Sequence, residues 1–312
     1  MPLTIRLYQP DDCWRVRAFL RETLPLYDYR ERNWPVARFD YYLWHGNLNI
    51  EHLNLSEVIS IWETEENEFA AVLTPEALGE AFLQVHPAWR SLALEEEMLE
   101  QAEARLAKTG ADGHQRLTVW AHAGDELRRD LLRRRGYQPQ PGAEYQRRRP
   151  VDASIPVAPL SPGFSVRALG DGLELLERCY ASGLAFHPDE PNVALENRQD
   201  PTWYRNIQTA PLYRRDLDLV AVAPDGAVAA FCTVWFDDVT RTGMFEPVGT
   251  VPAYQRRGLG KAVMAEGLRR LQRLGAVTAY VGSYSPRAHA LYAAMGFRDY
   301  EVCEPWEKEI RG

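Results

Sequence analysis

The sequence YQRRGLGKA at residues 254–262 places two glycines at the start of a pattern that is typical of a helix. From Gly258 to Leu274 apolar residues recur at helical spacing, and Gly275 follows as a stop. Glycines before a helix allow a sharp turn and a close approach of the backbone, while the free N–H groups of the helix N-terminus carry partial positive charge. The sequence therefore predicts an anion-binding turn, suited to a phosphate or diphosphate.

This turn differs from two common phosphate-binding motifs. It has no Gly-Lys-Ser/Thr after a first glycine and so is not a P-loop, and it lacks the complete Gly-x-Gly-x-x-Gly fingerprint of dinucleotide-binding folds. Nucleoside triphosphates and NAD are therefore poor candidates for the ligand.

Strand patterns surround the predicted helix on both sides. Residues 219–223 and 229–236 form a hairpin across Pro-Asp-Gly, and residues 244–251 form a strand that is interrupted by proline and glycine. A buried strand at 277–281, a helix at 287–295 and a last strand after Phe297 follow. The order predicts a mixed α/β fold.

The two halves of the chain resemble each other in three places, in the same order. Residues 4–7 match 165–168, residues 85–89 match 250–254, and residues 135–137 match 295–297. The offset is roughly 160 to 165 residues each time, as two copies of one fold would give. A proline-rich stretch lies between the halves, so we expect a first domain at 1–149, a linker at 150–162 and a second domain at 163–312.

Composition excludes several classes of function. The formal net charge of −8 argues against nucleic acid and anionic membrane as partners. The sequence shows neither a signal peptide nor a membrane-spanning segment, which predicts a cytoplasmic protein. Four scattered cysteines without a Cys-x-x-Cys pair predict reduced thiols and no metal site. A monomer and a homodimer are both consistent with the sequence.

A second motif, ALYAAMGF at residues 290–297, follows the anion-binding turn after one intervening strand. Together the two motifs resemble the Gcn5-related N-acetyltransferase superfamily, from Phe164 to the end of the sequence. The resemblance implies two tandem domains, each a mixed, mostly antiparallel sheet flanked by helices. It implies acetyl-CoA as the co-substrate and an amine as the acceptor.

The resemblance also implies a cofactor site. The turn would hold the pyrophosphate, the interrupted strand would pair with the pantetheine arm, and serines would replace the asparagine that the family often has ahead of the second motif. The residues assigned to acetyl-CoA are Val248, Gly249, Thr250, Val251, Gln255, Arg256, Arg257, Gly258, Leu259, Gly260, Lys261, Ser283 and Ser285.

Two residues are candidates for proton transfer. Tyr292 matches the tyrosine that protonates the departing thiolate in many family members, a role for which a phenol is suited. An attacking ammonium must first lose a proton, and Glu246, on the strand before the turn, is the candidate base. His187 and Asp189 are the alternatives. Each residue also has an alternative without a catalytic role: Tyr292 could be a packed core residue, and Glu246 could be an exposed residue of the strand.

The first copy lacks these features. When its motifs are aligned with the second, Ala93 and Glu95 replace the two glycines, Leu132 replaces Tyr292 and Ala81 replaces Glu246. A carboxylate in the turn would repel phosphate. We therefore expect the first domain to keep the fold without binding acetyl-CoA and to pack against the second domain, an arrangement that resembles other tandem acetyltransferases.

Two further clusters have simple structural explanations. An aromatic run between Tyr27 and Trp44 is expected to pack in the core, although it could line a pocket. A group of arginines on a predicted helix is expected to form a solvated face; its members are Arg128, Arg129, Arg133, Arg134 and Arg135.

The leading function is acetylation of a small-molecule amine. Acetylation of a protein lysine or N-terminus is one alternative, and a non-catalytic acetyl-CoA sensor is another. A closed acceptor pocket would distinguish the first from the second.

Overall fold

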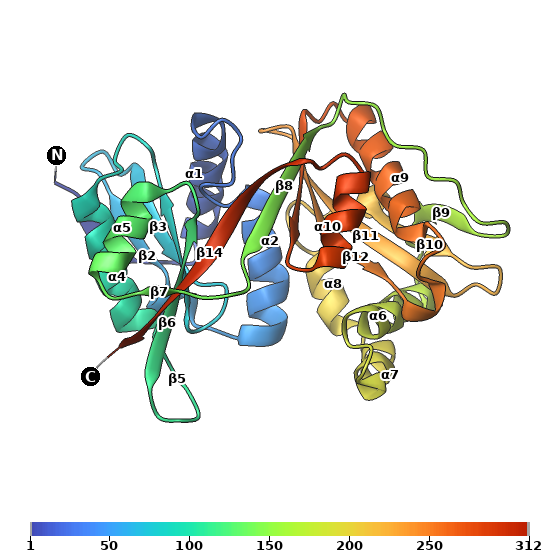
Figure 1. Cartoon of the computed structure of the whole chain (residues 1–312), viewed down its shortest axis with the longest axis horizontal. Coiled ribbons are helices and arrows are strands. Elements are labelled where there is room, and N and C mark those ends of the chain that lie inside the picture. Colours follow the sequence, from blue (N-terminus) through green and yellow to red (C-terminus); the bar gives the residue numbers. More distant parts are fainter. Residues whose placement is uncertain (1, 311–312) are drawn as a thin grey trace. The chain divides into compact units, whose positions relative to one another are not determined.

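The computed structural model of the chain describes residues 2–310 and divides them into two compact units. The first unit contains the chain up to Gln146 together with the residues from Glu301 onward, and the second is Arg147–Tyr300. Each contains a mixed, mostly antiparallel sheet flanked by helices, which confirms the predicted fold class (Figure 1).

The elements of the first unit are β1 (Thr4–Leu7), α1 (Asp12–Leu26), α2 (Val36–Tyr41), the π-helix η1 (Tyr42–Glu51), α3 (Leu55–Val58), β2 (Ser60–Glu63), β3 (Phe69–Thr74), β4 (Glu80–Val85), α4 (Leu92–Leu106), β5 (Lys108–Thr109), β6 (Gln115–His122), α5 (Glu126–Arg134) and β7 (Gln138–Pro139). Two strands extend across the boundary between the units, namely β8 (Glu144–Pro150) and β14 (Asp299–Ile310).

The elements of the second unit are β9 (Ser165–Ala168), α6 (Leu173–Phe186), α7 (Pro191–Gln199), α8 (Thr202–Gln208), the 3-10 helix η2 (Arg215–Leu217), β10 (Asp218–Val222), β11 (Val228–Asp237), β12 (Thr242–Thr250), the 3-10 helix η3 (Pro252–Tyr254), α9 (Leu259–Arg273), β13 (Thr278–Ser283) and α10 (Pro286–Ala294). The predicted hairpin, interrupted strand, helices and buried strand of this unit are confirmed, with ends that differ by a few residues.

Helix α9 is placed by its apolar stripe. Leu259, Val263, Leu268 and Leu271 are buried against the sheet, in one core with residues of β10 and β11. The helix ends where Gly275 takes φ +75°, the left-handed conformation that glycine adopts at a helix C-terminus. α9 and α10 cover one face of the sheet and α6 covers the other (Figure 1).

Strand order in the second unit is β13-β12-β11-β10-β9. The pairs from β9 to β12 are antiparallel, while β12 and β13 run parallel. Because α9 follows β12 directly, its N-terminus lies at the end of a central strand. This places the predicted anion-binding turn at the end of a strand that forms a parallel pair with β13.

The predicted domain limits differ from the structure at both ends. Strand β14 follows α10 in sequence but pairs antiparallel with β6 of the first unit, from Cys303↔His122 to Ile310↔Gln115 (Figure 1). At the other limit, Val151 was expected in the linker, but its N–H donates to Val277 O at 2.9 Å within the second unit. Alternating strand patterns identify a strand but not its partner, so this exchange was not readable from the sequence.

The segment expected to be a linker packs against the second unit. It forms no regular secondary structure from 155 to 161, as its prolines predict. Val151 is nevertheless fully buried, Ile155 and Ala158 contact the core, and Gln272 donates to Val151 O at 2.6 Å. It is therefore part of the second unit. Within residues 2–310 no helix has the length and apolar character needed to cross a membrane.

Candidate active site

The turn before α9 leaves the N-terminus of the helix open. Arg256 has φ +66° and Gly258 has φ +76°, both in the left-handed region. Gly258 is the N-cap residue and no side chain caps the helix. The first helical bond runs from Ala262 N–H to Gly258 O, so the N–H groups of the residues just before Ala262 have no helical acceptor. An anion can accept from them.

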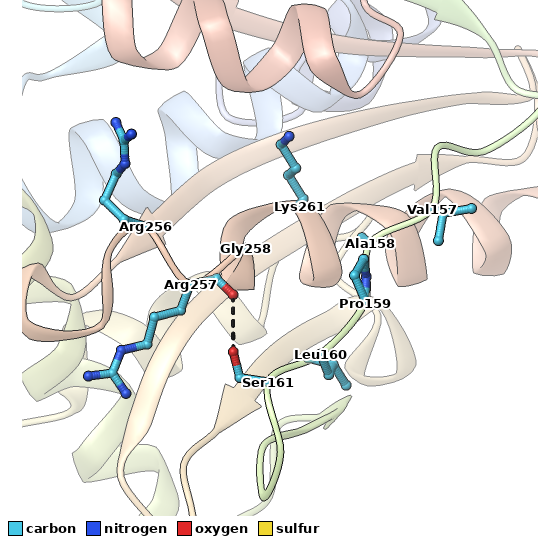
Figure 2. A pocket seen from close by; sticks show the side chains of 9 residues that line it. All are labelled: Val157, Ala158, Pro159, Leu160, Ser161, Arg256, Arg257, Gly258 and Lys261. Atoms are coloured by element: carbon cyan, nitrogen blue, oxygen red, sulfur yellow. Dashed lines mark hydrogen bonds between the residues drawn. The ribbon is translucent and has the colours of Figure 1, made fainter.

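The turn is also positively charged. Arg256, Arg257 and Lys261 are exposed, and none of them forms an ion pair within residues 2–310 (Figure 2). Arg257 lies over the ring of Tyr254 at 5.6 Å from its centroid. Gln255 has a different role, because its side chain donates to Thr250 O at 3.3 Å and ties the turn to β12. Side-chain and helix charges thus favour phosphate at this turn.

Strand β12 contains a β-bulge. The β11–β12 register shifts between Cys232 and Val234, so that Glu246 and Pro247 lie opposite the single residue Thr233. The Glu246–Pro247 peptide bond is cis. A bulge adds twist and redirects the strand that carries it. It accounts for the proline in the predicted strand and places Glu246 at the point where the strand turns.

Beyond the bulge, β12 separates from β13. Parallel pairing joins residues 242–244 to 278–280, and it does not continue over residues 245–250 in the part of the chain described. The opposite edge of β12 stays paired with β11 as far as Thr250. One edge of residues 245–250 therefore has no strand partner, an arrangement that an extended ligand can complete as an added strand.

Gly249 is required by close packing on this segment. A Cβ built on Gly249 would lie 2.2 Å from Cζ of Phe231. The ring of Phe231 therefore lies directly against the backbone of β12, which only glycine allows. This contact fixes the strand segment that the sequence assigns to the pantetheine arm.

Tyr292 and Glu246 lie close enough to interact electrostatically. Tyr292, on α10, is 7% exposed and its hydroxyl makes no hydrogen bond within residues 2–310. Burial, and then the charge of Glu246, raise the pKa of Tyr292. The backbone of Glu246 is fixed by Trp235, whose indole N–H donates to its carbonyl oxygen at 2.6 Å. A phenol with a raised pKa stays protonated near neutral pH, as a general acid must.

The other predicted site residues have structural contacts of their own. Ser283 is buried and accepts a hydrogen bond from Arg147 Nε at 3.3 Å, whereas Ser285 caps α10 by accepting from Ala288 N–H at 3.3 Å. Their contact with pantetheine stays a prediction.

The alternative bases lie in the loop after α6. His187 and Asp189 are exposed, and His187 Nδ1 is 3.3 Å from Glu190 Oε1. Neither is among the groups whose charge shifts the pKa of Tyr292, whereas Glu246 is. The identity of the base stays a prediction.

A buried polar cluster on the α6 face was missed by the sequence reasoning. Asp218 is fully buried and accepts hydrogen bonds from Tyr204, Tyr213 and Thr233. Burial raises the pKa of Asp218. The guanidinium of Arg178 is also buried, at 3.6 Å from the centroid of Phe231, with no hydrogen-bond acceptor in residues 2–310. Each of these polar residues lies alone among apolar residues in the sequence, so no local pattern indicated that they form a cluster.

The first unit shows why the aligned glycines and Glu95 do not correspond. Helix α4 starts at Leu92, five residues after Pro87, whereas α9 starts at Leu259, seven residues after Pro252. The turn is thus two residues shorter in the first unit. Glu95 is the fourth residue of its helix and Gly260 the second, so the predicted pairing of these two was wrong.

The shorter turn is closed from within the protein. Ser91 caps α4 by accepting from Leu94 N–H at 3.2 Å. The carboxylate of Glu95 is fully buried between Arg90 (2.6 Å) and Arg128 (2.9 Å). Burial would raise the pKa of Glu95, but the two guanidinium groups outweigh it and lower the pKa. Arg128 is therefore a buried ion-pair partner, which corrects the expectation that it lies on a solvated face.

The edge of β4 that corresponds to the open edge of β12 is also occupied. The side-chain amide of Asn33 accepts from Val85 N–H at 2.9 Å and donates to Val85 O at 3.1 Å. Tyr27 donates to the same carbonyl at 2.8 Å. Trp34 from the aromatic run is buried beside them, as core packing predicts. At these corresponding positions the first unit has an occupied strand edge on β4 and a capped helix α4, whereas α9 of the second unit has no side-chain cap and β12 has no strand partner at residues 245–250 on the matching edge.

Comparisons with known proteins agree with this geometry. The acetyltransferase (GNAT) family model matches residues 176–297. Mycothiol acetyltransferase from Mycobacterium avium is 31% identical over 239 residues, 71% of this chain and 71% of that protein. The protein of that name from Pseudarthrobacter chlorophenolicus is 28% identical over 248 residues, 75% of this chain and 72% of that protein.

Solved structures share the fold across both units. A Gcn5-related N-acetyltransferase from Sphaerobacter thermophilus covers 100% of this chain and 98% of its own, with a TM-score of 0.61 and 19% identity. A tandem GNAT protein from the clavulanic acid biosynthesis pathway covers 100% of this chain and 99% of its own, with a TM-score of 0.63 and 15% identity.

The second unit contains the family's two motifs. It also has a helix without a side-chain cap, a parallel pair of strands (β12 and β13) that separates after residue 244, and a buried tyrosine. The relatives match both units. The chain belongs to the acetyltransferase (GNAT) family as a tandem member, and it is an acetyl-CoA-dependent acyltransferase.

Proposed function

We propose that the second unit transfers the acetyl group of acetyl-CoA to the primary amine of a small molecule by direct attack. The observation that carries the proposal is the convergence of the open edge of β12, the uncapped N-terminus of α9 and the Glu246–Tyr292 pair in one unit. The N–H groups and cations of the turn would hold the pyrophosphate, and residues 248–251 would pair with the pantetheine arm.

The chemistry follows from the two titratable side chains. Glu246 takes a proton from the acceptor ammonium, directly or through water, and the freed lone pair attacks the thioester carbonyl. A C–N bond forms, the attacking nitrogen loses a second proton, and the C–S bond breaks. The phenol of Tyr292 protonates the departing thiolate and regains a proton from the reaction mixture. The products are an amide and CoA, with one proton released overall.

The small-molecule acceptor rests on the relatives. They are named for mycothiol, a thiol compound, and their similarity extends over about three quarters of this chain. Sequence identity near 30% supports the chemical type of the acceptor. It does not say which compound the acceptor is, because specificity resides in the residues of the site. The first unit, with its cofactor-binding features closed, is proposed to contribute structure and not a second active site.

Acetyl-CoA binding measured by calorimetry is the first test. One site per chain is expected, weakened more by Lys261→Glu than by Lys261→Gln, since the two variants differ only in charge. Position 260 is less suitable, because a Cβ there would lie 3.2 Å from Thr250 Oγ1 and disturb packing by itself. No binding, or equal effects of the two variants, would contradict the proposed cofactor site.

A panel of amines then tests the acceptor. Release of CoA is expected with low-molecular-weight primary amines and not with lysine-containing or N-terminal peptides. The reverse preference would show a protein acetyltransferase. Binding of acetyl-CoA without release for any acceptor would instead favour the sensor.

A further inference from the structure

The anion-binding turn of the second unit has a second wall that no family motif predicts. A pocket of about 460 Å³ lies between the turn with the start of α9 and the segment 157–161 (Figure 2). Its lining residues are Val157, Ala158, Pro159, Leu160, Ser161, Arg256, Arg257, Gly258 and Lys261. The segment between the domains thus faces the turn that is proposed to hold the pyrophosphate.

The segment is held against the turn by specific contacts. Ser161 Oγ donates to Arg257 O at 3.5 Å. A Cβ on Gly258 would lie 3.8 Å from Pro159 O, so the two backbones pass close to each other. Phe164, just after the segment, packs edge-to-face on Tyr254 at 6.0 Å. Both walls of the pocket are therefore parts of the same folded unit.

The lining is cationic and contains no carboxylate. Arg269 on the same helix pairs with Glu266 at 3.2 Å, whereas the three cations of the pocket have no ion-pair partner in residues 2–310. Figure 2 shows Arg256 and Lys261 extending to one side of the turn and Arg257 to the other. Cations on two sides can neutralise two separate phosphate groups.

Acetyl-CoA carries two such groups. Its diphosphate is joined through one ribose to a phosphate monoester at the 3′ position, and a monoester carries about −1.5 to −2 charges near neutral pH. The segment also presents apolar surface, since Val157 is 89% exposed and Leu160 40% exposed. Exposed apolar side chains beside a phosphate site suit the flat face of a nucleobase.

We infer that this pocket binds the 3′-phosphorylated adenosine of CoA, with Arg257 on the 3′-phosphate and the segment 157–161 as the wall for the nucleoside. The inference rests on acetyl-CoA being the donor. It assigns to the connection between the domains a direct part in cofactor recognition. It also predicts that the protein distinguishes CoA from its 3′-dephospho form.

The test compares acetyl-CoA with acetyl-3′-dephospho-CoA by calorimetry. The unaltered protein is expected to bind the dephospho ligand about tenfold or more weakly, as the loss of a charge-assisted contact implies. In Arg257→Gln the affinity for acetyl-CoA falls toward that for the dephospho ligand, and the ratio approaches one. Lys261→Gln weakens both ligands, and Arg205→Gln, at an exposed position on α8, weakens neither.

The segment is tested by a matched pair at Leu160. Leu160→Glu is expected to weaken acetyl-CoA more than Leu160→Gln does, because a carboxylate there repels phosphate, and the difference shrinks for the dephospho ligand. Equal affinity of the unaltered protein for the two ligands overturns the inference and leaves the proposed function intact. Absence of binding by either ligand overturns both.

Discussion

The side-chain amide of Asn33 makes two hydrogen bonds to the backbone of Val85, one to its N–H and one to its carbonyl oxygen. The amide of a side chain thus occupies both backbone groups at this strand edge, whereas at the corresponding Thr250 of the second unit the side chain of Gln255 donates only to the carbonyl oxygen. This pair of bonds explains structurally why one copy of the fold is closed while the other is proposed to bind a cofactor.

Asn33→Ala should therefore destabilise the first unit. Asn33 is 3% exposed, and its removal leaves the buried N–H of Val85 without an acceptor, at about 1–3 kcal/mol, while the carbonyl oxygen of Val85 keeps its hydrogen bond from Tyr27. The unfolding midpoint in denaturant is expected to fall, whereas Asn192→Ala, an exposed change on α7, leaves it unaltered. Acetyl-CoA stoichiometry should stay at one per chain. A second binding event would show that Asn33 alone blocks the first unit.

Tyr292→Phe isolates the role of one hydroxyl. Because this hydroxyl makes no hydrogen bond within residues 2–310, its removal leaves the packing intact. Acetyl-CoA affinity and thermal stability should be unchanged, and the rate of CoA release should fall about 100-fold or more. Since the pKa of Tyr292 is raised, the phenol of the unaltered enzyme stays protonated at alkaline pH, and its rate should show no fall near the ordinary pKa of tyrosine. An unchanged rate in the variant would make Tyr292 a core residue only.

Glu246→Gln should produce a defect that depends on pH. Without a base the acceptor must lose its proton to solvent, so the rate of CoA release should be low near neutral pH and recover as the pH approaches the pKa of the amine. Calorimetry should give unaltered acetyl-CoA affinity. If the variant and the unaltered enzyme show the same pH profile, Glu246 is not the base. His187→Gln and Asp189→Asn would then test the two alternative bases in the same way.

Gly249→Ala tests the fixed position of β12. The added methyl group would meet Phe231 at 2.2 Å, so the strand or the ring must shift. Acetyl-CoA affinity is expected to fall, and the double variant with Phe231→Leu should recover part of it because the smaller side chain makes room. Thermal unfolding of each variant checks the fold. If the double variant binds acetyl-CoA no better than Gly249→Ala, the contact with Phe231 does not cause the loss of affinity.

His122 should make the first unit sensitive to acid. It is 4% exposed, its Nε2–H donates to Glu31 O at 2.8 Å, and burial, followed by the charge of Arg32, lowers its pKa to about 3. The unfolded chain therefore binds a proton that the folded chain excludes, over the window from the ordinary histidine pKa of about 6.5 down to about 3. The stability contributed by neutral His122 is complete above this window and is lost as the pH falls through it.

Lowering the pH from 7 to 5 should cost about 2 kcal/mol through this residue. Denaturant titrations of the unaltered protein and of His122→Gln at pH 5, 6 and 7 measure it, because glutamine can still donate to Glu31 O but does not titrate. The two curves of stability against pH should converge in acid. Parallel curves would show that His122 titrates as an ordinary histidine.

Local patterns predicted much of the second unit. Glycines at the turn, the apolar stripe of α9 and the strand interrupted at Pro247 each correspond to an element at nearly the expected residues. These features are encoded over a few neighbouring residues, so one sequence suffices to read them. The candidate site was predictable for the same reason, because the turn and the interrupted strand are adjacent in sequence.

Features that depend on distant residues were not predictable. The pairing of Glu95 with Arg128 joins two helices, and the aligned glycine positions shifted because two residues are missing from a turn. The hydrogen bond between Val85 N–H and the side chain of Asn33 likewise joins segments far apart in sequence. A single sequence shows which side chains are charged or polar, but it does not show which partner buries them.

The exchange of β14 affects how the chain acquires its structure. Strand β6 of the first unit pairs with β4 and β5, but it lacks the partner of its other edge until residues 303–310 have been synthesised, after the entire second unit. Until then an edge of eight residues presents unpaired backbone groups, a known route to aggregation. Neither half is therefore a self-sufficient piece for expression. A fragment cut at the connecting segment would leave one half without its closing strand and the other with an unpaired one, and co-expression of the two fragments should restore both.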